Sequence, residues 1–240
     1  MLREQWQIIR DEIAEDITKG SILSGEKLPT EPELCQKFGV GRHSVRRAID
    51  ALAVEGKLRV EHGRGIFVED APLIDYNIGR RARFRQNLRS QGVVPGGSVI
   101  GYELCPASPV VAKALQLAEG VPVHCLFSQG MADGVPICLG YSYHDAARFA
   151  DLPSLRQKNV PITDVYRHYG IQDYFRLTTS IYARRAEKDE AQMLRQHAAQ
   201  PVLVVCKTDS DSARRPIAYS EGIWASDRVK FTFEEREEGQ

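Results

Sequence analysis

Apolar side chains recur at helical spacing near the start of the chain. One stripe predicts an amphipathic helix over residues 4–19 that ends at Gly20, and it is made by Trp6, Ile8, Ile9, Ile13 and Ile17. A helix with a single apolar face buries that face against its neighbours, so this helix is expected to pack behind the elements that follow it.

Two shorter helices are predicted next, separated by a turn at Gly39-Val40-Gly41. The first covers about 31–38 and opens on a capping box, in which Thr30 caps the first turn and Glu33 returns a hydrogen bond. The second covers about 42–55, with Gly56 as its terminating residue. Its inward face is expected to consist of Val45, Ala48, Ile49 and Leu52.

A two-stranded ribbon follows, Leu58–Val60 and Gly65–Val68, joined by the tip Glu61-His62-Gly63-Arg64. Helix, tight turn, helix and hairpin is the layout of a winged helix-turn-helix that reads duplex DNA. The net charge of the chain is zero, so a DNA-binding surface has to be local. Residues 42–64 meet this condition, because they hold six Lys or Arg against three Asp or Glu.

The pattern breaks at Pro72, which predicts a linker over 71–79 between a first domain of residues 1–70 and a second of residues 80–240. The second domain begins with an arginine-rich stretch, 80–89, that is expected to be helical from about 82 to 90.

Strands and short helices then alternate, and Ala132-Asp133-Gly134 is a strong hairpin signal. We expect an α+β fold on an antiparallel sheet, because most of the strands are linked as hairpins with helices between some of them. The expected strands are Val99–Leu104, Val121–Met131, Val135–Tyr143, 172–184, Val202–Thr208, Pro216–Trp224 and Val229–Phe233, and the expected helices are Ser108–Leu117, two pieces within 151–169, and Ala186–His197.

Other residue patterns argue against several classes of protein. The five cysteines are scattered without the spacing of a zinc site, and we interpret them as buried thiols in a reducing compartment. The alternative is that one of them is a catalytic or redox-sensing cysteine. No metal cluster, cofactor-binding loop or nucleophile–base pair is recognisable, so we expect no metal, no cofactor and no enzyme. No long apolar run or signal peptide is present, which predicts a cytoplasmic protein that does not span a membrane.

The stretch LPTEPELCQKFGVGRHSVRRAIDALAVEGKLRVEHGRGIFV, residues 28–68, closely resembles the DNA-binding domain of the GntR family of bacterial transcription regulators. The second part resembles the UTRA ligand-binding domain of the HutC subfamily, which has a chorismate-lyase-like fold. That resemblance is carried by ADGVPI (132–137), RPIAYSEG (215–222) and SDR (226–228). Within the subfamily, DYNIGRRARFRQNL (75–88), the Phe149 region and WASDRVKFTF (224–233) look most like regulators of phosphonate metabolism.

The resemblance to the GntR family implies DNA contacts from Arg42, Ser44 and Arg46 in the major groove, and from the wing tip in the minor groove. Arg42 and Arg46 are one helical turn apart, and an arginine can bond a guanine edge through two hydrogen bonds. The alternative is that the basic positions are only a solvated helix face. The predicted DNA-binding residues are Thr30, Arg42, His43, Ser44, Arg46, Arg47, His62, Gly63 and Arg64.

The effector site is predicted on weaker grounds. Relatives that bind sugar phosphates place two arginines where this chain has Ser128 and Gly130, and an acidic residue where it has Ala218, so that phosphate clamp is absent. The arginines have accumulated at 80–89 instead, where a helix N-terminus would add to an anion site. The alternative is an exposed basic linker near DNA. The predicted effector residues are Arg81, Arg83, Phe84, Arg85, Ser128, Tyr143, Arg176, Thr178 and Tyr219. For Ser128, Tyr143 and Tyr219 the alternative of a hydrogen-bonded core residue is favoured over a pocket residue.

These patterns lead to one leading hypothesis and three alternatives. The leading hypothesis is a repressor of a phosphonate or phosphorus-compound operon that binds an inverted-repeat operator in double-stranded DNA as a homodimer and responds to a small anionic effector. The alternatives are a regulator of the same type for another catabolic operon (with a sugar, amine or histidine-type effector), a chorismate-lyase-like enzyme, and an architectural DNA-binding protein that senses nothing.

Overall fold

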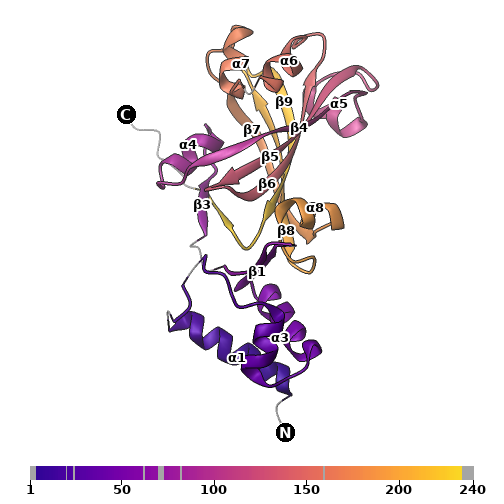
Figure 1. The fold of residues 1–240 in the computed structure, drawn as a ribbon. Coiled ribbons are helices and arrows are strands. Elements are labelled where there is room, and N and C mark those ends of the chain that lie inside the picture. The colour runs from indigo at the N-terminus through magenta and orange to yellow at the C-terminus, as the bar shows by residue number, and fades with distance from the viewer. Residues whose placement is uncertain are drawn as a thin grey trace. The chain divides into compact units, whose positions relative to one another are not determined.

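The structure of the chain is a computed structural model, and it describes residues 4–19, 21–23, 25–61, 63–69, 73–81, 83–158 and 160–233. The chain divides into two compact units (Figure 1). The first unit comprises Met1–Leu73 together with Arg185–Pro201, and the second comprises Ile74–Arg184 together with Val202–Gln240. None of the described helices is long and apolar enough to cross a membrane.

The first unit has the elements predicted from the sequence. They are α1 (Gln5–Thr18), α2 (Glu31–Phe38), α3 (Arg42–Val54), β1 (Leu58–Glu61) and β2 (Gly65–Val68). The two strands pair antiparallel from Leu58 opposite Val68 to Glu61 opposite Gly65. The layout confirms the expected winged helix-turn-helix.

One core cluster holds the three helices and the ribbon together, and its buried members include Ile9, Ile13, Leu34, Val45, Ala48, Ile49, Leu52, Leu58 and Val68. Ile8 was expected on the apolar stripe of α1, but it is 50% exposed. Successive residues of a helix are about 100° apart, so Ile8 turns away from the face that its neighbour Ile9 buries.

The capping box of α2 is present. The backbone N–H and the hydroxyl of Thr30 both donate to Glu33 Oε2, each at 2.7 Å. These bonds lower the pKa of the exposed Glu33 carboxyl below its ordinary value. The segment before the helix is also fixed, because the Leu28 N–H donates to the Ile66 carbonyl of β2.

The second unit is built on a six-stranded sheet in the order β4-β5-β6-β9-β8-β7 (Figure 1). Its strands are β4 (Pro95–Pro106), β5 (Pro122–Ala132), β6 (Val135–Asp145), β7 (Phe175–Arg185), β8 (Pro201–Ser210) and β9 (Pro216–Ala225). The pairings of β4 with β5, β5 with β6, β6 with β9 and β8 with β9 are antiparallel. The expected α+β fold on an antiparallel sheet is therefore confirmed.

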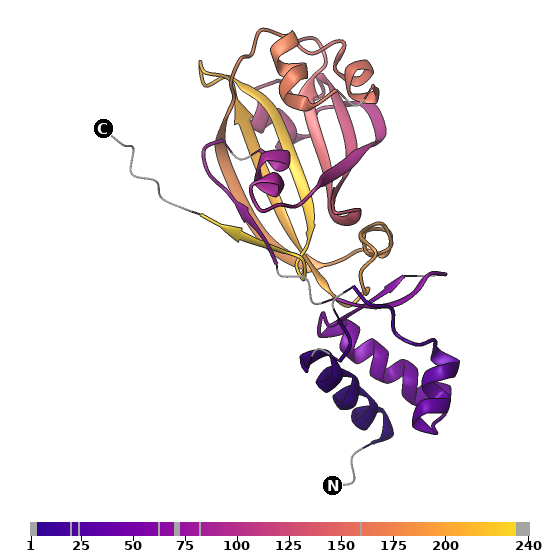
Figure 2. The same cartoon turned by 60° about the vertical axis from the view of Figure 1, so that its left-hand side comes forward.

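Four short helices of the second unit accompany this sheet: α4 (Phe84–Arg89), α5 (Pro109–Leu115), α6 (Leu152–Gln157) and α7 (Ile162–His168). The fifth short helix, α8 (Lys188–Leu194), belongs to the first unit. Helices α6 and α7 lie at one end of the sheet, and Figure 2 shows α4 over its face. The α6–α7 core cluster includes Phe149, Leu152, Val165 and Tyr166, and it packs on Leu126 of β5.

The expected linker over 71–79 is only partly a linker. Residues Ile74–Asn77 form β3, which pairs in parallel with β10 (Val229–Thr232) from the far end of the chain. Four residues are too few to show a strand period, and their partner lies more than a hundred and fifty residues away, so local sequence carried no signal for this pairing. Residues 70–72 lie outside the described part of the chain.

The segment that contains α8 clusters with the first unit, although the sequence assigned it to the second domain. The side-chain amide of Gln200 donates to the Ala53 carbonyl near the end of α3 at 2.9 Å, and Gln200 is buried. His197 Nε2 lies 3.8 Å from Asp50 on the same helix. The five cysteines are free thiols of intermediate burial, so they are less buried than expected. The thiol of Cys138 is the most enclosed of those whose pKa burial raises.

Candidate DNA-binding and effector sites

The N-terminal half of α3 presents the basic surface that was predicted to read DNA. Arg42, His43 and Arg46 are exposed, while Val45 and Ala48 on the other face of the helix are buried in the core. Gly41 precedes the helix in an extended conformation without a side-chain cap, and its carbonyl accepts from the Ser44 N–H, which leaves the N–H groups of Arg42 and His43 at the start of the helix. A helix start of this kind can present both cations and backbone donors to a phosphate-lined groove.

Two arginines of this surface already have acidic partners. Arg46 Nε donates to Glu31 Oε2 at 2.9 Å; the arginine side chain is exposed and the glutamate is half-buried. Arg47 Nη1 donates to Glu4 at 2.8 Å and lies over the ring of Trp6, 4.4 Å from its centroid. Arg47 therefore fastens α3 to α1, whereas Arg46 is held by an exposed contact that is easily exchanged for DNA.

The wing is described except at His62, which lies outside the described residues. Gly63 has φ of 74°, a backbone conformation that a side chain would strain, so the tight tip requires glycine there. Arg64 is exposed and forms an ion pair with Glu61 at 2.6 Å. Thr30, also in the predicted set, is exposed at the start of α2, where its hydroxyl bonds Glu33.

The second unit contains a cavity of about 320 Å³ over one face of the sheet. Small residues make its floor, because four neighbouring strands place Ser128, Gly140 and Gly222 side by side next to Val205. The next row along the strands brings Ser142 and Ser220 beside Lys207. Side chains this small leave room above the sheet, which makes a hollow in the face.

Five cationic side chains from five different segments line this cavity: Arg83 before α4, Arg85 in α4, Arg156 in α6, Arg176 in β7 and Lys207 in β8. Lys207 forms an ion pair with the buried Asp209, and Arg176 Nε lies 3.7 Å from the same carboxylate.

Arg83 is held more firmly than the other cations. It donates to Asp173 Oδ1 and to the Tyr174 carbonyl at 2.9 Å each, and it stacks 3.4 Å from the Tyr174 ring centroid. Within the described residues, Arg85 and Arg156 have no carboxylate partner. Asp173 and Asp209 pair with three of the five cations, and Glu221 also lines the cavity. Five cations therefore stand against three carboxylates, and the cavity has a surplus of positive charge.

The pKa shifts report the same surplus. Burial lowers the pKa of Lys207, and the charges of Arg176 and Arg83 lower it further, against the opposing effect of Asp209. Burial also lowers the pKa of Arg156, with a further lowering from Arg85. The Arg176 Nε atom is buried and has no hydrogen-bond partner among the described residues. An anion in the cavity would relieve this repulsion and accept these hydrogen bonds.

Aromatic rings form the remaining wall of the cavity: Tyr76 of β3, Phe84 of α4, Trp224 of β9 and Phe231 of β10. The Tyr76 ring centroid is 4.8 Å from that of Trp224 and 5.8 Å from that of Phe231. Phe84 and Trp224 are 6.1 Å apart. The charge of Arg176 acts on the Tyr76 hydroxyl, whose pKa burial raises, so the aromatic wall adjoins the cationic one.

The structure brings five of the nine predicted effector residues together at this cavity, namely Arg83, Phe84, Arg85, Ser128 and Arg176. The expected helix N-terminus contributes less than anticipated, because α4 begins only at Phe84 and is six residues long. The alternative interpretation of 80–89 as a basic linker fits only some of its members: Arg81 is exposed, pairs with Asp173 and lies over the Phe175 ring.

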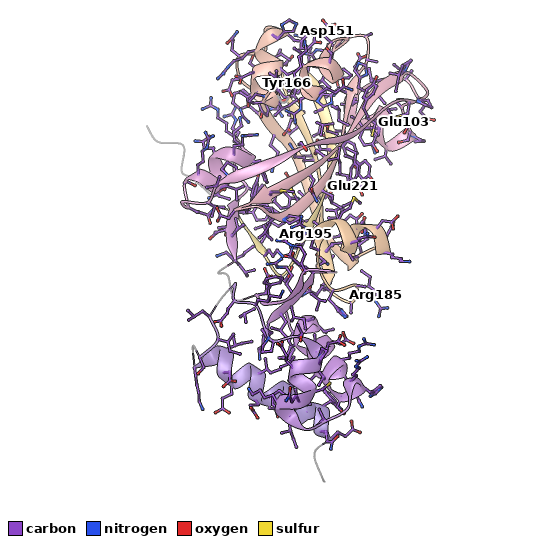
Figure 3. The ribbon with its side chains drawn as sticks, in the orientation of Figure 1. Glu103, Asp151, Tyr166, Arg185, Arg195 and Glu221 are labelled. Carbon is purple, nitrogen blue, oxygen red and sulfur yellow. The ribbon has the colours of Figure 1, made fainter. Side chains whose placement is uncertain are left out.

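The other predicted residues lie elsewhere. Tyr143 and Tyr219 pair across β6 and β9 and pack with α5 on the opposite face of the sheet. Side chains alternate between the faces of a strand, so the neighbours Ser142 and Ser220 face the cavity in their place. Thr178 is exposed and does not line the cavity. In Figure 3, Tyr166 lies among the helices at one end of the sheet and Glu221 lies on β9 near its middle.

Sequence reasoning missed Lys207, Arg156 and most of the aromatic wall. A signal for Lys207 did exist, because it follows the apolar run Val202–Cys206 in a strand where a charged residue requires a partner. Arg156 carried no such signal, since it is one arginine among several polar residues in a short helix.

Comparisons with known proteins agree with this two-part arrangement. Residues 6–68 match the gntR family of bacterial regulatory proteins, and residues 90–230 match the UTRA domain. The chain is 35% identical over 229 residues to an uncharacterized HTH-type transcriptional regulator of Rhizobium meliloti (strain 1021), covering 95% of this chain and 94% of that one. It is 36% identical over 215 residues to the probable transcriptional regulator PhnF of Escherichia coli (strain K12), covering 88% and 87%.

The fold is also similar to the crystal structure of PhnF from Mycobacterium smegmatis, with a TM-score of 0.62, 23% sequence identity, and coverage of 95% of this chain and 99% of that one. The chain belongs to the GntR family of bacterial transcription regulators and carries a UTRA domain as its second part. It is a regulator that binds DNA and a small-molecule effector, not an enzyme.

Proposed function

We propose that the chain is a repressor of the HutC type that binds an inverted-repeat operator as a homodimer in the cytoplasm. A small anionic effector, a phosphonate or related phosphorus compound, binds the cavity of the second unit and releases the operator. The observation that carries this proposal is the convergence of five cationic side chains on one cavity, in a chain whose first unit presents an exposed basic helix.

An anionic effector follows from the charge of the cavity. Arginine bonds phosphate-like oxygens through parallel N–H groups, and the bonds are strongest where both partners are charged and shielded from water. Arg85 and Arg156 repel each other without a neutralising carboxylate among the described residues. A sugar without a charged group or an amine would leave that repulsion in place, so these effectors are disfavoured.

The phosphonate class is supported by where the family resemblance falls on the structure. The stretches that look most like regulators of phosphonate metabolism, 75–88 and 224–233, contain Tyr76, Arg83, Phe84, Arg85, Trp224 and Phe231. All six of these residues line the cavity. The resemblance therefore lies in the residues that would contact the effector.

A route from effector to DNA is available along β8. Val205 and Lys207 of this strand line the cavity, and the strand begins at Pro201, directly after Gln200. Gln200 bonds the Ala53 carbonyl of the DNA-reading helix α3. A ligand that pulls Lys207 would act on this bond through a hydrogen-bonded strand. A coupling of about 1–3 kcal/mol is enough to change operator affinity severalfold to about a hundredfold.

The homodimer is proposed because a two-fold protein pairs with a two-fold operator, and one winged helix covers only a half-site. The test of the whole proposal is selection of bound duplexes from a random DNA library by the full-length chain. Recovery of an inverted repeat that the chain binds as a dimer in sedimentation supports it. Recovery of no preferred sequence at low salt would contradict it. An architectural DNA-binding protein would also recover bound DNA in the selection, but no added anion would lower its affinity for that DNA.

A further inference from the structure

Gly130 stands where relatives that bind sugar phosphates are expected to have an arginine, and the ring of Phe84 packs against it. A Cβ on Gly130 would lie 2.9 Å from Phe84 Cζ and 2.6 Å from Cys138 Sγ, so only glycine allows the Phe84 ring to lie where it does. In the same way, a Cβ on Gly222 would lie 2.6 Å from Trp224 Nε1. Gly130 and Gly222 thus leave the space that the rings of Phe84 and Trp224 occupy at the cavity.

The cationic side chains of the cavity come from elements other than β5, the strand that carries Ser128 and Gly130. Arg156 belongs to α6, Arg176 to β7 and Lys207 to β8, while Arg83 and Arg85 flank Phe84. The cavity therefore has a cationic part and an apolar part that meet at Tyr76 and Arg176. An inorganic oxyanion would fill the first part and leave the aromatic wall against water.

We infer that the cavity selects an organic phosphonate or phosphate-like dianion whose carbon substituent is apolar and uncharged, and that it discriminates against inorganic phosphate and against aminoalkyl analogues. This inference rests on the proposed function, because it names the part of the anionic effector that contacts Tyr76, Phe84, Trp224 and Phe231. The cationic surplus is what disfavours an ammonium tail, even though aromatic rings alone attract cations.

The size of the preference follows from the area that the rings can cover. Each methylene buried against an apolar wall contributes about 0.8 kcal/mol, which is about fourfold in affinity. Affinity should therefore rise by about this factor with each carbon added to the substituent, until the cavity of about 320 Å³ is full.

The experiment is isothermal titration of the full-length protein with inorganic phosphate, methylphosphonate, ethylphosphonate, n-propylphosphonate and 2-aminoethylphosphonate. The last two have nearly the same size and differ in the charge of the terminal group. The expected result is a stepwise rise in affinity from phosphate to n-propylphosphonate, with 2-aminoethylphosphonate weaker than n-propylphosphonate. Equal affinity across the alkyl series, or tighter binding of the amino compound, would overturn the inference.

Variants separate the two parts of the cavity. Phe84→Leu should flatten the dependence on chain length and leave phosphate binding unchanged. Arg85→Gln should weaken every member of the series by one common factor and keep the dependence on chain length. Arg89→Gln is the matched control, because Arg89 is an exposed arginine of the same helix that does not line the cavity. If Phe84→Leu lowers the affinity for every ligand by the same factor and keeps the dependence on chain length, then Phe84 does not contact the carbon substituent.

The outcomes also separate this inference from the proposed function. If all anions bind equally well and release the operator, only the inference about the substituent fails. If none binds while the operator is still bound, the anionic effector itself is wrong and the inference falls with it.

Discussion

The ring of Phe84 lies directly over Gly130, at a distance that leaves no room for a side chain on that strand position. Relatives that bind sugar phosphates are expected to carry an arginine there. The contact leaves no room for an arginine side chain at position 130, and the cationic groups of the cavity are Arg83, Arg85, Arg156, Arg176 and Lys207 on other elements.

Replacing Gly130 with alanine should destabilise the second unit by about 1–3 kcal/mol, because the added Cβ would overlap Phe84 and Cys138. Chemical denaturation measures this as a loss in the free energy of unfolding. Gly140→Ala is the control, since its Cβ would meet nothing closer than Ser128 Oγ at 3.4 Å. Alanine there should be neutral or stabilising by up to about 1 kcal/mol. An equal loss in the free energy of unfolding in both variants would show that the contact of Phe84 with Gly130 does not require glycine.

The DNA-reading surface gives a prediction with an unusual sign. Arg46→Ala should weaken operator binding by about 1–3 kcal/mol, because Arg46 is predicted to contact a base edge in the major groove. Glu31→Gln should strengthen binding by about 0.2–1 kcal/mol, because Arg46 must leave the Glu31 carboxylate to reach DNA and the pair is exposed. Fluorescence anisotropy with a labelled operator measures both effects. Unchanged affinity in Arg46→Ala would remove this arginine from the contact set.

The buried His144 predicts a loss of stability in acid. Its Nε2 lies 2.9 Å from the Tyr166 hydroxyl, and burial lowers its pKa from 6.5 to about 3. Between pH 6.5 and about pH 3, His144 is therefore protonated in the unfolded chain and neutral in the folded chain. The stabilising contribution is complete above pH 6.5 and is lost as the pH falls from 6.5 toward about 3, by up to about 1.4 kcal/mol per pH unit.

Denaturation of the full chain at about pH 5 and about pH 7 measures this dependence. His124 acts in the same direction, because burial lowers its pKa as well. A His144→Gln variant should show a shallower dependence on pH than the parent chain. An identical slope in the two proteins would assign the acid sensitivity to other groups.

The contact of Gln200 with α3 predicts a variant that binds its ligand but no longer responds to it. Gln200→Met keeps the side-chain length and removes the hydrogen bond to the Ala53 carbonyl. Ligand affinity measured by calorimetry should be unchanged, while the effect of ligand on operator binding should shrink. Gln192→Met, at an exposed position of α8, should behave like the parent chain. A full ligand response in Gln200→Met would exclude this bond as the route.

Much of the first unit could be predicted from sequence because its signals are local. The capping box at Thr30, the helical stripe of α3 and the glycines of the wing each depend on residues within one or two turns. The second unit depends on pairings between distant segments. No local pattern marks Ile74–Asn77 as the partner of Val229–Thr232, so the segment looked like a linker.

The candidate effector site shows the same limit. Arg83, Arg85 and Arg176 were found by their charge, but assigning a strand residue to one face needs the correct register. Tyr143 and Tyr219 were selected for their chemistry, and each lies one position away from the serine that faces the cavity. A shift of one residue moves a side chain to the other face of the sheet, which is why polar groups alone did not define the pocket.

The central claim is that an organic anion in the cavity releases the operator, and one titration tests it most directly. The full-length chain is bound to the operator recovered by selection, and n-propylphosphonate is added while anisotropy of the labelled duplex is followed. We expect a loss of operator affinity of about fivefold to a hundredfold in the parent chain, and a much smaller loss at the same concentration in Arg85→Gln. Unchanged operator affinity with the cavity saturated, as judged by calorimetry, would contradict it.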